Sequence, residues 1–168
     1  MRALRKPQLD LRLDAAAPDA ATRWHDRATI PYRGRNLCLR LDDGPAETTL
    51  EGDELHLPLP PGATPRQIQD RTEAWLREQA MRHLSTLVTE KFPPGRKAPA
   101  LAERRGPLRL VLSFARGGHW IEATGDNTLR CHWRLIEQPD AVIARAVDRA
   151  LALLPATQAM ADLFAAEA

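Results

Sequence analysis

The sequence predicts an α+β protein, because segments with strand periodicity and segments with helix periodicity come in blocks rather than in strict alternation. Leucines recur at every second position in two early segments and again in two later ones, while two long segments place apolar residues at helical spacing. We therefore expect an antiparallel β-rich N-terminal part with one helix, followed by a second part in which a β-hairpin packs on another helix.

Two strands with one buried face are predicted over residues 37–41 and 55–59. Period two places alternate side chains on the same face of a strand, so the leucines form the buried face of each. Residues 42–45, Asp-Asp-Gly-Pro, have the composition of a turn and separate the two strands. The buried face consists of Leu37, Leu39, Leu41, Leu55, Leu57 and Leu59.

The first helix has a distinct start and a distinct end. Thr64 can cap it, Pro65 suits the first helical position, and Gln67 completes a capping box with Thr64. The helix should run to about Lys91, because the prolines of residues 92–95 cannot continue it. Its apolar stripe consists of Ile68, Trp75, Leu76, Ala80, Leu84, Leu87 and Val88.

The second part begins with a strand whose apolar face runs from Leu108 to Phe114. A hairpin over about 119–136 follows, with its turn at 124–127 and its second strand continuing from Leu129 to Leu135. The next helix should span about 140–154 and end at Pro155, and a short last helix should start near Thr157. The apolar stripe of the predicted 140–154 helix consists of Val142, Ile143, Ala146, Val147, Ala150, Leu151 and Leu154.

The predicted organisation is a flexible N-terminal arm, residues 1–27, and a single domain, residues 28–168. In the arm, alternating leucines at positions 9, 11 and 13 leave an added edge strand as an alternative. Trp24 either anchors the arm to the domain or contacts a partner. Trp75, Trp120 and Trp133 are expected in the core, since large aromatic residues dominate the burial of small domains.

A proline-rich basic connector over residues 93–107 separates the two parts of the domain. We consider two interpretations: a solvated loop, or a weak nucleic-acid contact in which clustered cations attract phosphates. The formal net charge of only +2 argues against a protein that coats nucleic acid. The basic patch consists of Lys91, Arg96, Lys97, Arg104, Arg105, Arg109 and Arg116.

Cysteine content and hydropathy predict a cytoplasmic protein with no membrane contact. Cys38 and Cys131 form neither a C-x-x-C motif nor a disulfide framework, so reduced thiols are expected. No apolar run is long enough for a transmembrane helix, and the first seven residues lack the apolar segment of a signal peptide.

The segment from Arg109 to Ile143 contains the runs RLVLSFA, LRCHWRLI and PDAVI, with Trp120 between the first two. Together they resemble the YgjP-like metallopeptidase family, whose members are relatives of the SprT-like zincins. Residues 30–35, residues 55–60 and Trp75 fit the same family, so the resemblance extends from about residue 28 to the end of the chain. It implies a zincin-like second half, with the hairpin packed on the former active-site helix.

This resemblance also implies a zinc site, in which an H-E-x-x-H motif supplies two ligands and a catalytic glutamate, and a later histidine supplies the third ligand. In this sequence the corresponding positions hold Asp148, Arg149 and Ala152, with the last near Gln158. Alanine cannot bind a metal, arginine is a fixed cation, and no histidine follows His132. We therefore expect zinc, cofactor and catalysis to be lost, which predicts a pseudoenzyme that serves as a binding or regulatory module.

The candidate binding residues are His119, Trp120, His132, Asp148 and Arg149. Cys131 and His132 are adjacent on one strand and point to opposite faces, so they cannot meet at one metal ion. We expect Cys131 to pack with Leu129 and Trp133, His132 to be exposed, and Asp148 to pair with Arg145 along the helix.

The partner of such a module would be an unidentified protein or peptide. Two other functions stay open at this point. One is a metal-dependent hydrolase with altered ligands that acts on nucleoside phosphates, with Asp148 holding Mg²⁺. The other is nucleic-acid contact through the basic region 91–116.

Overall fold

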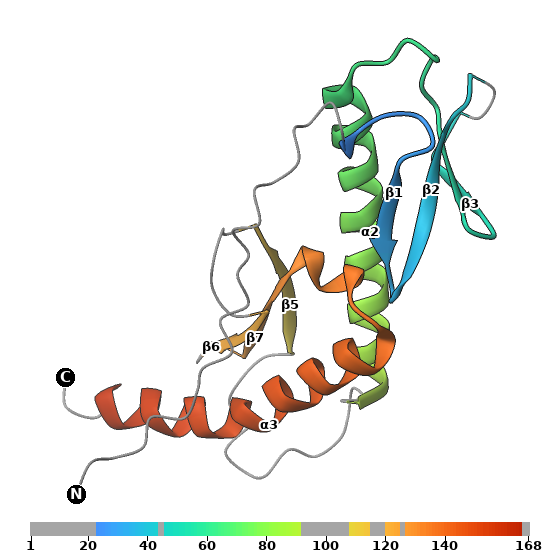
Figure 1. Ribbon diagram of the computed structural model, residues 1–168. Coiled ribbons are helices and arrows are strands. Elements are labelled where there is room, and N and C mark those ends of the chain that lie inside the picture. The colour runs from blue at the N-terminus through green and yellow to red at the C-terminus, as the bar shows by residue number, and fades with distance from the viewer. Residues whose placement is uncertain (1–22, 44–45, 92–107, 115–119, 125–126, 166–168) are drawn as a thin grey trace, which may run out of the picture.

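The computed structural model describes residues 23–43, 46–91, 108–114, 120–124 and 127–165, and it describes side chains in these ranges up to Leu154 (Figure 1). The described residues form two β-sheets, two long helices and a short 3₁₀ helix, which confirms the α+β prediction. The expected connector 93–107, the arm up to residue 22 and part of each predicted turn lie outside the described residues.

The first sheet contains β1 (Thr29–Tyr32), β2 (Arg35–Leu41), β3 (Thr49–Glu51) and β4 (Glu54–Leu57), in the order β1-β2-β4-β3. The two strands found by leucine alternation, β2 and β4, pair in parallel, while β1–β2 and β3–β4 are antiparallel. The register places Leu39 beside Leu55 and Leu41 beside Leu57. One face of the sheet is therefore a continuous apolar layer, of which Leu37, Leu39, Leu55 and Leu57 are fully buried.

Helix α2 (Pro65–Lys91) lies between the two sheets and has the predicted bounds. Its capping box is present, since the Thr64 N–H donates to Gln67 Oε1 at 2.8 Å and the Gln67 N–H donates to Thr64 Oγ1 at 3.3 Å. On the side of the first sheet, the rings of Tyr32 and Trp75 pack with their centroids 5.1 Å apart. The buried residues of α2 are Ile68, Thr72, Trp75, Leu76, Ala80, Leu84 and Val88.

The second sheet has the order β5-β7-β6, with β5 (Arg109–Ser113) parallel to β7 (Thr128–His132) and β6 (Ile121–Thr124) antiparallel to it. The observed hairpin β6–β7 confirms the hairpin predicted over about 119–136. The predicted extension of its second strand to Leu135 is wrong, because the chain turns at Trp133 into the 3₁₀ helix η2 (Trp133–Glu137). This turn points both Leu135 and Ile136 into the core, where each is 1% exposed.

Helix α3 (Asp140–Ala165) packs on β6 and continues through Pro155. The predicted helix end at Pro155 and the separate helix from Thr157 are therefore wrong. Proline removes one backbone donor, and the alanine- and leucine-rich sequence around it favours helix strongly enough to offset that loss. Among the described residues, no helix combines the length and the apolar character needed to cross a membrane.

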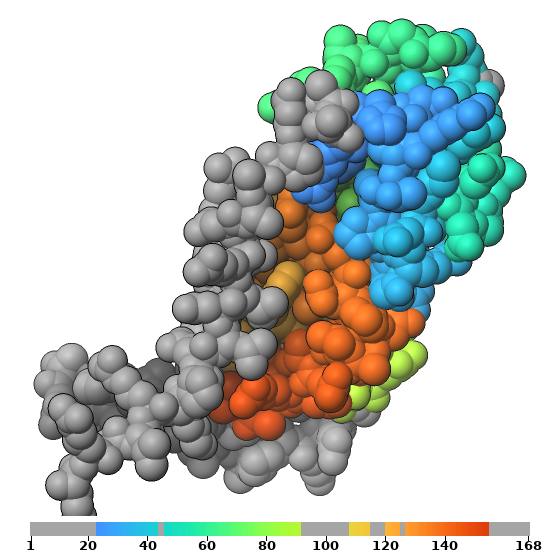
Figure 2. All heavy atoms as spheres, viewed as in Figure 1, coloured from blue at the N-terminus to red at the C-terminus, as the bar shows by residue number. Residues whose placement is uncertain are grey.

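The two sheets are joined where the β1–β2 turn meets the start of α3. The Arg33 N–H donates to the carbonyl oxygen of Ile136 at 2.8 Å, and Gly34 lies against Pro139. Figure 2 shows segment 133–154, in orange, lying directly against the blue and cyan N-terminal segments. Trp24, from the expected arm, is 5% exposed and belongs to the core, so it anchors the chain to the body of the protein.

Candidate binding site at the end of the second sheet

Two of the predicted binding residues, Trp120 and His132, meet where β7 ends. The His132 N–H donates to the carbonyl oxygen of Trp120 at 2.8 Å, and the two rings stand edge to face with their centroids 6.0 Å apart. Trp120 is 44% exposed, so its predicted place in the core is wrong. The reason is register: β7 buries Leu129 and Cys131 on one face, and His132 and its neighbour Trp120 belong to the other.

His132 lies at the transition from β7 to η2, where its side chain caps the 3₁₀ helix. Its Nδ1 accepts a hydrogen bond from the Arg134 N–H at 3.2 Å, and its ring is half-buried rather than exposed as predicted. An Nδ1 that accepts places the proton of the neutral imidazole on Nε2. This nitrogen is then a donor rather than a base, which limits His132 to binding or capping in its neutral form.

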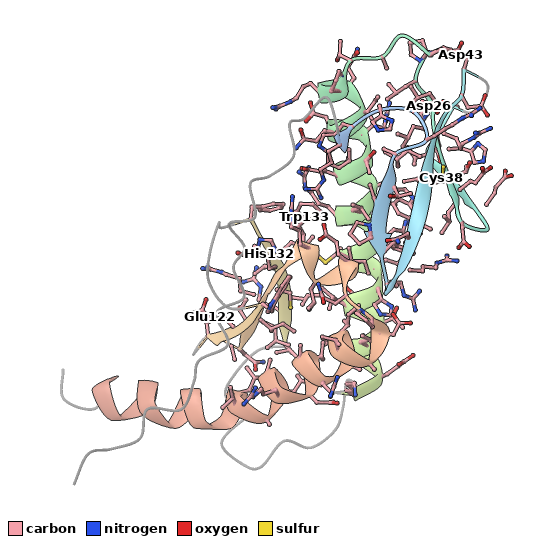
Figure 3. All side chains as sticks on the ribbon, in the orientation of Figure 1. Asp26, Cys38, Asp43, Glu122, His132 and Trp133 are labelled. Carbon is pink, nitrogen blue, oxygen red and sulfur yellow. The ribbon has the colours of Figure 1, made fainter. Side chains whose placement is uncertain are left out.

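Next to His132, the Trp133 side chain is buried between two arginines, as predicted for a core residue. The guanidinium carbons of Arg77 and Arg134 each lie 5.2 Å from its ring centroid, and Figure 3 shows His132 and Trp133 together where β7 ends. Arg77 also lies 5.7 Å from the ring of Phe114. Phe114 is 60% exposed, contrary to its predicted place on a buried strand face, because β5 ends one residue earlier.

Two carboxylates balance the two arginines. Glu73 binds Arg77 one helical turn away, and Glu137 Oε1 lies 3.9 Å from Arg134 Nε. Burial raises the pKa of Glu137, and the charge of Arg134 opposes that effect. The charges at this end of the sheet therefore compensate one another. We call Phe114, Trp120 and His132, together with Arg77 and Arg134, the aromatic surface; it includes both faces of the sheet at this end, with the Trp120–His132 pair on one and Phe114 beside Arg77 of α2 on the other.

The positions that the resemblance assigns to the zinc motif lie elsewhere, on the exposed side of α3. Arg149 and Ala152 are exposed, and the side chain of Gln158 lies outside the described part of the chain. Asp148 Oδ1 lies 2.6 Å from Lys91 Nζ, at the end of α2. The predicted pairing of Asp148 with Arg145 is therefore wrong, and Arg145 instead donates to the carbonyl oxygen of Ala141 at 3.2 Å.

Apart from the Trp120–His132 pair, the structure does not bring the described residues of the predicted site together. His132 and Trp120 belong to the sheet face that Leu129 and Cys131 leave outside the core, whereas Asp148 and Arg149 lie on α3, and His119 lies outside the described residues. No group of three or more His, Cys, Asp or Glu side chains within the described ranges could hold a metal ion. Cys131 is fully buried, as predicted, and burial raises the pKa of its thiol to about 12.

Only two residues of the predicted basic patch lie within the described ranges. Lys91 is paired with Asp148, and Arg109 is exposed at the start of β5. The others, Arg96, Lys97, Arg104, Arg105 and Arg116, lie outside those ranges.

The sequence interpretation missed a charged cluster where the two parts of the fold meet. Arg33 binds both oxygens of Asp140, with Nε–Oδ1 at 2.7 Å and Nη2–Oδ2 at 2.8 Å, and His83 of α2 faces the same carboxylate. Arg33 and Gly34 both adopt positive φ in the β1–β2 turn, and this tight turn places the Arg33 side chain in the cluster. Nothing in the sequence links this turn to Asp140, which lies 107 residues later.

Comparisons with models of protein families, with curated proteins and with solved structures found no match to this chain.

Proposed function

We propose that the protein is a catalytically inactive, metallopeptidase-like cytoplasmic protein that acts as a binding or regulatory module. The observation that carries this proposal is the ion pair between Lys91 and Asp148, at 2.6 Å. Asp148 stands where the resemblance places the first zinc ligand, and the Lys91 ammonium already neutralises it. An ammonium within hydrogen-bonding distance of a carboxylate repels a dication from the same place.

The neighbouring positions support the same conclusion. Arg149, at the place of the catalytic glutamate, is a fixed cation, and Ala152 offers no ligand atom. The nucleoside-phosphate alternative requires Asp148 to hold Mg²⁺, so the pair with Lys91 argues against it as well. Of the predicted basic patch, the described residues are Lys91, which Asp148 neutralises, and Arg109, which is exposed, so nucleic-acid contact stays an open alternative.

The aromatic surface is the proposed binding place. Exposed Phe114 and Trp120 offer apolar contact area at one end of a sheet whose outer strands, β5 and β6, each pair with one neighbour among the described residues. An extended peptide can add to such an edge through main-chain hydrogen bonds, and aromatic residues beside the edge supply side-chain specificity. The compensated charges of Arg77 and Arg134 favour a peptide over a polyanion.

Metal content tests the inactive part of the proposal. The protein, dialysed against excess Zn²⁺ and then against buffer, is expected to retain far less than one zinc per chain by elemental analysis. Asp148→Ala and the matched variant Asp70→Ala, an exposed aspartate paired with Arg66 on α2, should give the same value. Stoichiometric zinc that is lost only in Asp148→Ala would overturn the proposal.

Peptide selection tests the binding part. Peptides enriched from a random display library on the intact protein should bind wild type and lose at least tenfold in affinity for Trp120→Ser and Phe114→Ser. Met81→Ser, which alters an exposed apolar residue on α2, is the control and should bind normally. Enriched peptides that bind all three variants equally would contradict a site at the aromatic surface.

A further inference from the structure

His83 on α2 places a ring nitrogen beside a carboxylate without a hydrogen bond between them. Its Nε2 is buried, has no hydrogen-bond partner among the described residues, and lies 3.6 Å from Asp140 Oδ1. A neutral imidazole that carries its proton on Nδ1 turns an Nε2 lone pair toward the carboxylate. Two facing acceptors do not bind each other, so while the ring is neutral another group must hold the Asp140 carboxylate in place.

Arg33 is that other group. Its guanidinium binds Asp140 through two hydrogen bonds, of 2.7 Å and 2.8 Å, and its backbone N–H binds the carbonyl oxygen of Ile136. Arg33 belongs to the β1–β2 turn and Asp140 begins α3. The bidentate pair therefore links the β1–β2 turn to the start of α3, and His83 lies at its side.

The surroundings of His83 keep it neutral near pH 7. Burial is the largest cause that lowers its pKa, and the charge of Arg33 lowers it further. Asp140 from α3 and Glu90 from α2 itself oppose these effects without reversing them. Arg33, Asp140 and Glu90 are the charged groups that act on the ring from the β1–β2 turn, from α3 and from α2.

We propose that His83, Asp140 and Arg33 form an acid-sensitive latch, in which protonation of His83 draws the Asp140 carboxylate away from Arg33 and loosens the β1–β2 turn. A protonated imidazole has an N–H on both nitrogens, so Nε2 becomes a donor to Oδ1, the oxygen that Arg33 Nε now binds. Two cations then share one carboxylate, and the imidazolium competes with Arg33 Nε for Oδ1. This competition weakens the bidentate anchor of the turn, while the helices keep their packing.

The direction of the pH effect follows from the depressed pKa. The unfolded or released state binds a proton on His83 at higher pH than the latched state does, so acid favours release. The latch is fully formed above the ordinary histidine pKa of 6.5 and weakens as the pH falls below it. Asp140 stays ionised throughout this range, because its hydrogen bonds to Arg33 hold its pKa below the usual value.

Amide hydrogen exchange at the β1–β2 turn measures the latch directly. After correction for intrinsic rates, the protection of the Arg33 amide should fall at least tenfold between pH 7.5 and pH 5.0, and that of Leu84 in α2 should stay constant. His83→Gln, which has a neutral side chain, should show no such fall. His56→Gln removes a histidine whose side chain is equally buried, at 19% exposed, and should behave as wild type.

Two results would overturn the latch: wild-type protection that does not change with pH, or an equal fall in His83→Gln. If His83→Gln loses its fold by circular dichroism, the titration of the His83 ring in wild type and in Arg33→Met decides the question by NMR. Removal of Arg33 frees Asp140 for the imidazolium, so the ring should titrate at a higher pH in the variant. An unchanged titration would show that the three groups are not coupled.

Discussion

Gly34 packs so closely on Pro139 that a Cβ atom at Gly34 would lie 3.0 Å from both the Cα and the Cβ of Pro139. Gly34 also has a φ of +78°, a conformation that side chains other than glycine rarely adopt. Both the backbone conformation and the contact therefore require glycine at this point.

Three glycines allow these two requirements to be separated. Gly34→Ala should lower the free energy of unfolding by about 2–4 kcal/mol, because a left-handed backbone and an overpacked contact both add cost. Gly52 has a φ of +58° and no neighbour within 4 Å, so Gly52→Ala should cost only about 1–2 kcal/mol. Gly62→Ala, with open space and no positive φ, is the control and should be neutral. Urea unfolding measures all three, and equal losses at Gly34 and Gly52 would contradict the contact with Pro139.

The capping box of α2 predicts a second stability difference. Thr64→Ala removes the side-chain acceptor for the Gln67 N–H, and should cost about 1 kcal/mol by urea unfolding. Thr86→Ala is the matched control, because the Thr86 hydroxyl only donates to the Arg82 carbonyl oxygen in the middle of the same helix. An equal fall in the free energy of unfolding of Thr86→Ala would show that the effect of Thr64→Ala does not come from its capping of α2.

Thr72 offers a substitution that should stabilise the protein. It is fully buried in α2, and its Oγ1 has no hydrogen-bond partner among the described residues. Thr72→Val replaces an unsatisfied hydroxyl with a methyl group of similar size, and should raise the free energy of unfolding by about 1–2 kcal/mol. An unchanged or lower stability would show that the hydroxyl is bonded, and Thr86→Val serves as the exposed comparison.

The two cysteines should differ sharply in reactivity. Burial raises the pKa of the Cys131 thiol to about 12, so almost no thiolate exists at pH 8 and the sulfur is also inaccessible. Cys38 is half-buried on the first sheet. In a Cys38→Ser variant, a thiol reagent should therefore label Cys131 only after denaturation. Rapid labelling of the folded variant would contradict the burial of Cys131.

Features set by neighbouring residues could be predicted from the sequence. The start of α2 follows from Thr64, Pro65 and Gln67, three residues within one helical turn. The hairpin β6–β7 likewise depends on apolar alternation around one short turn. Each of these signals lies within a few residues of the structure that it determines, so no knowledge of the fold is needed to interpret it.

Features set by distant residues could not be predicted. Leucine alternation identifies β2 and β4 as strands, yet their parallel pairing depends on β3, a short strand with a weak pattern. The same holds for the candidate site: Asp148 has Arg145 near it in sequence, but α2 places Lys91 closer in space. The exposure of Trp120 depends on which face of β7 becomes the core, and a single tryptophan carries no periodicity that reveals this.

The contact between Gly34 and Pro139 also has a consequence for synthesis of the chain. At about 5–20 residues per second, roughly 5–20 s separate the emergence of the β1–β2 turn from that of its partner. During this interval the first sheet is on the ribosome without its later partner. The Arg33 guanidinium and the apolar face of the sheet that will pack against the Ile136 segment are both uncovered. Ribosome-bound chains that end before Ile136 should accordingly be the form of this protein most exposed to chaperones and proteases.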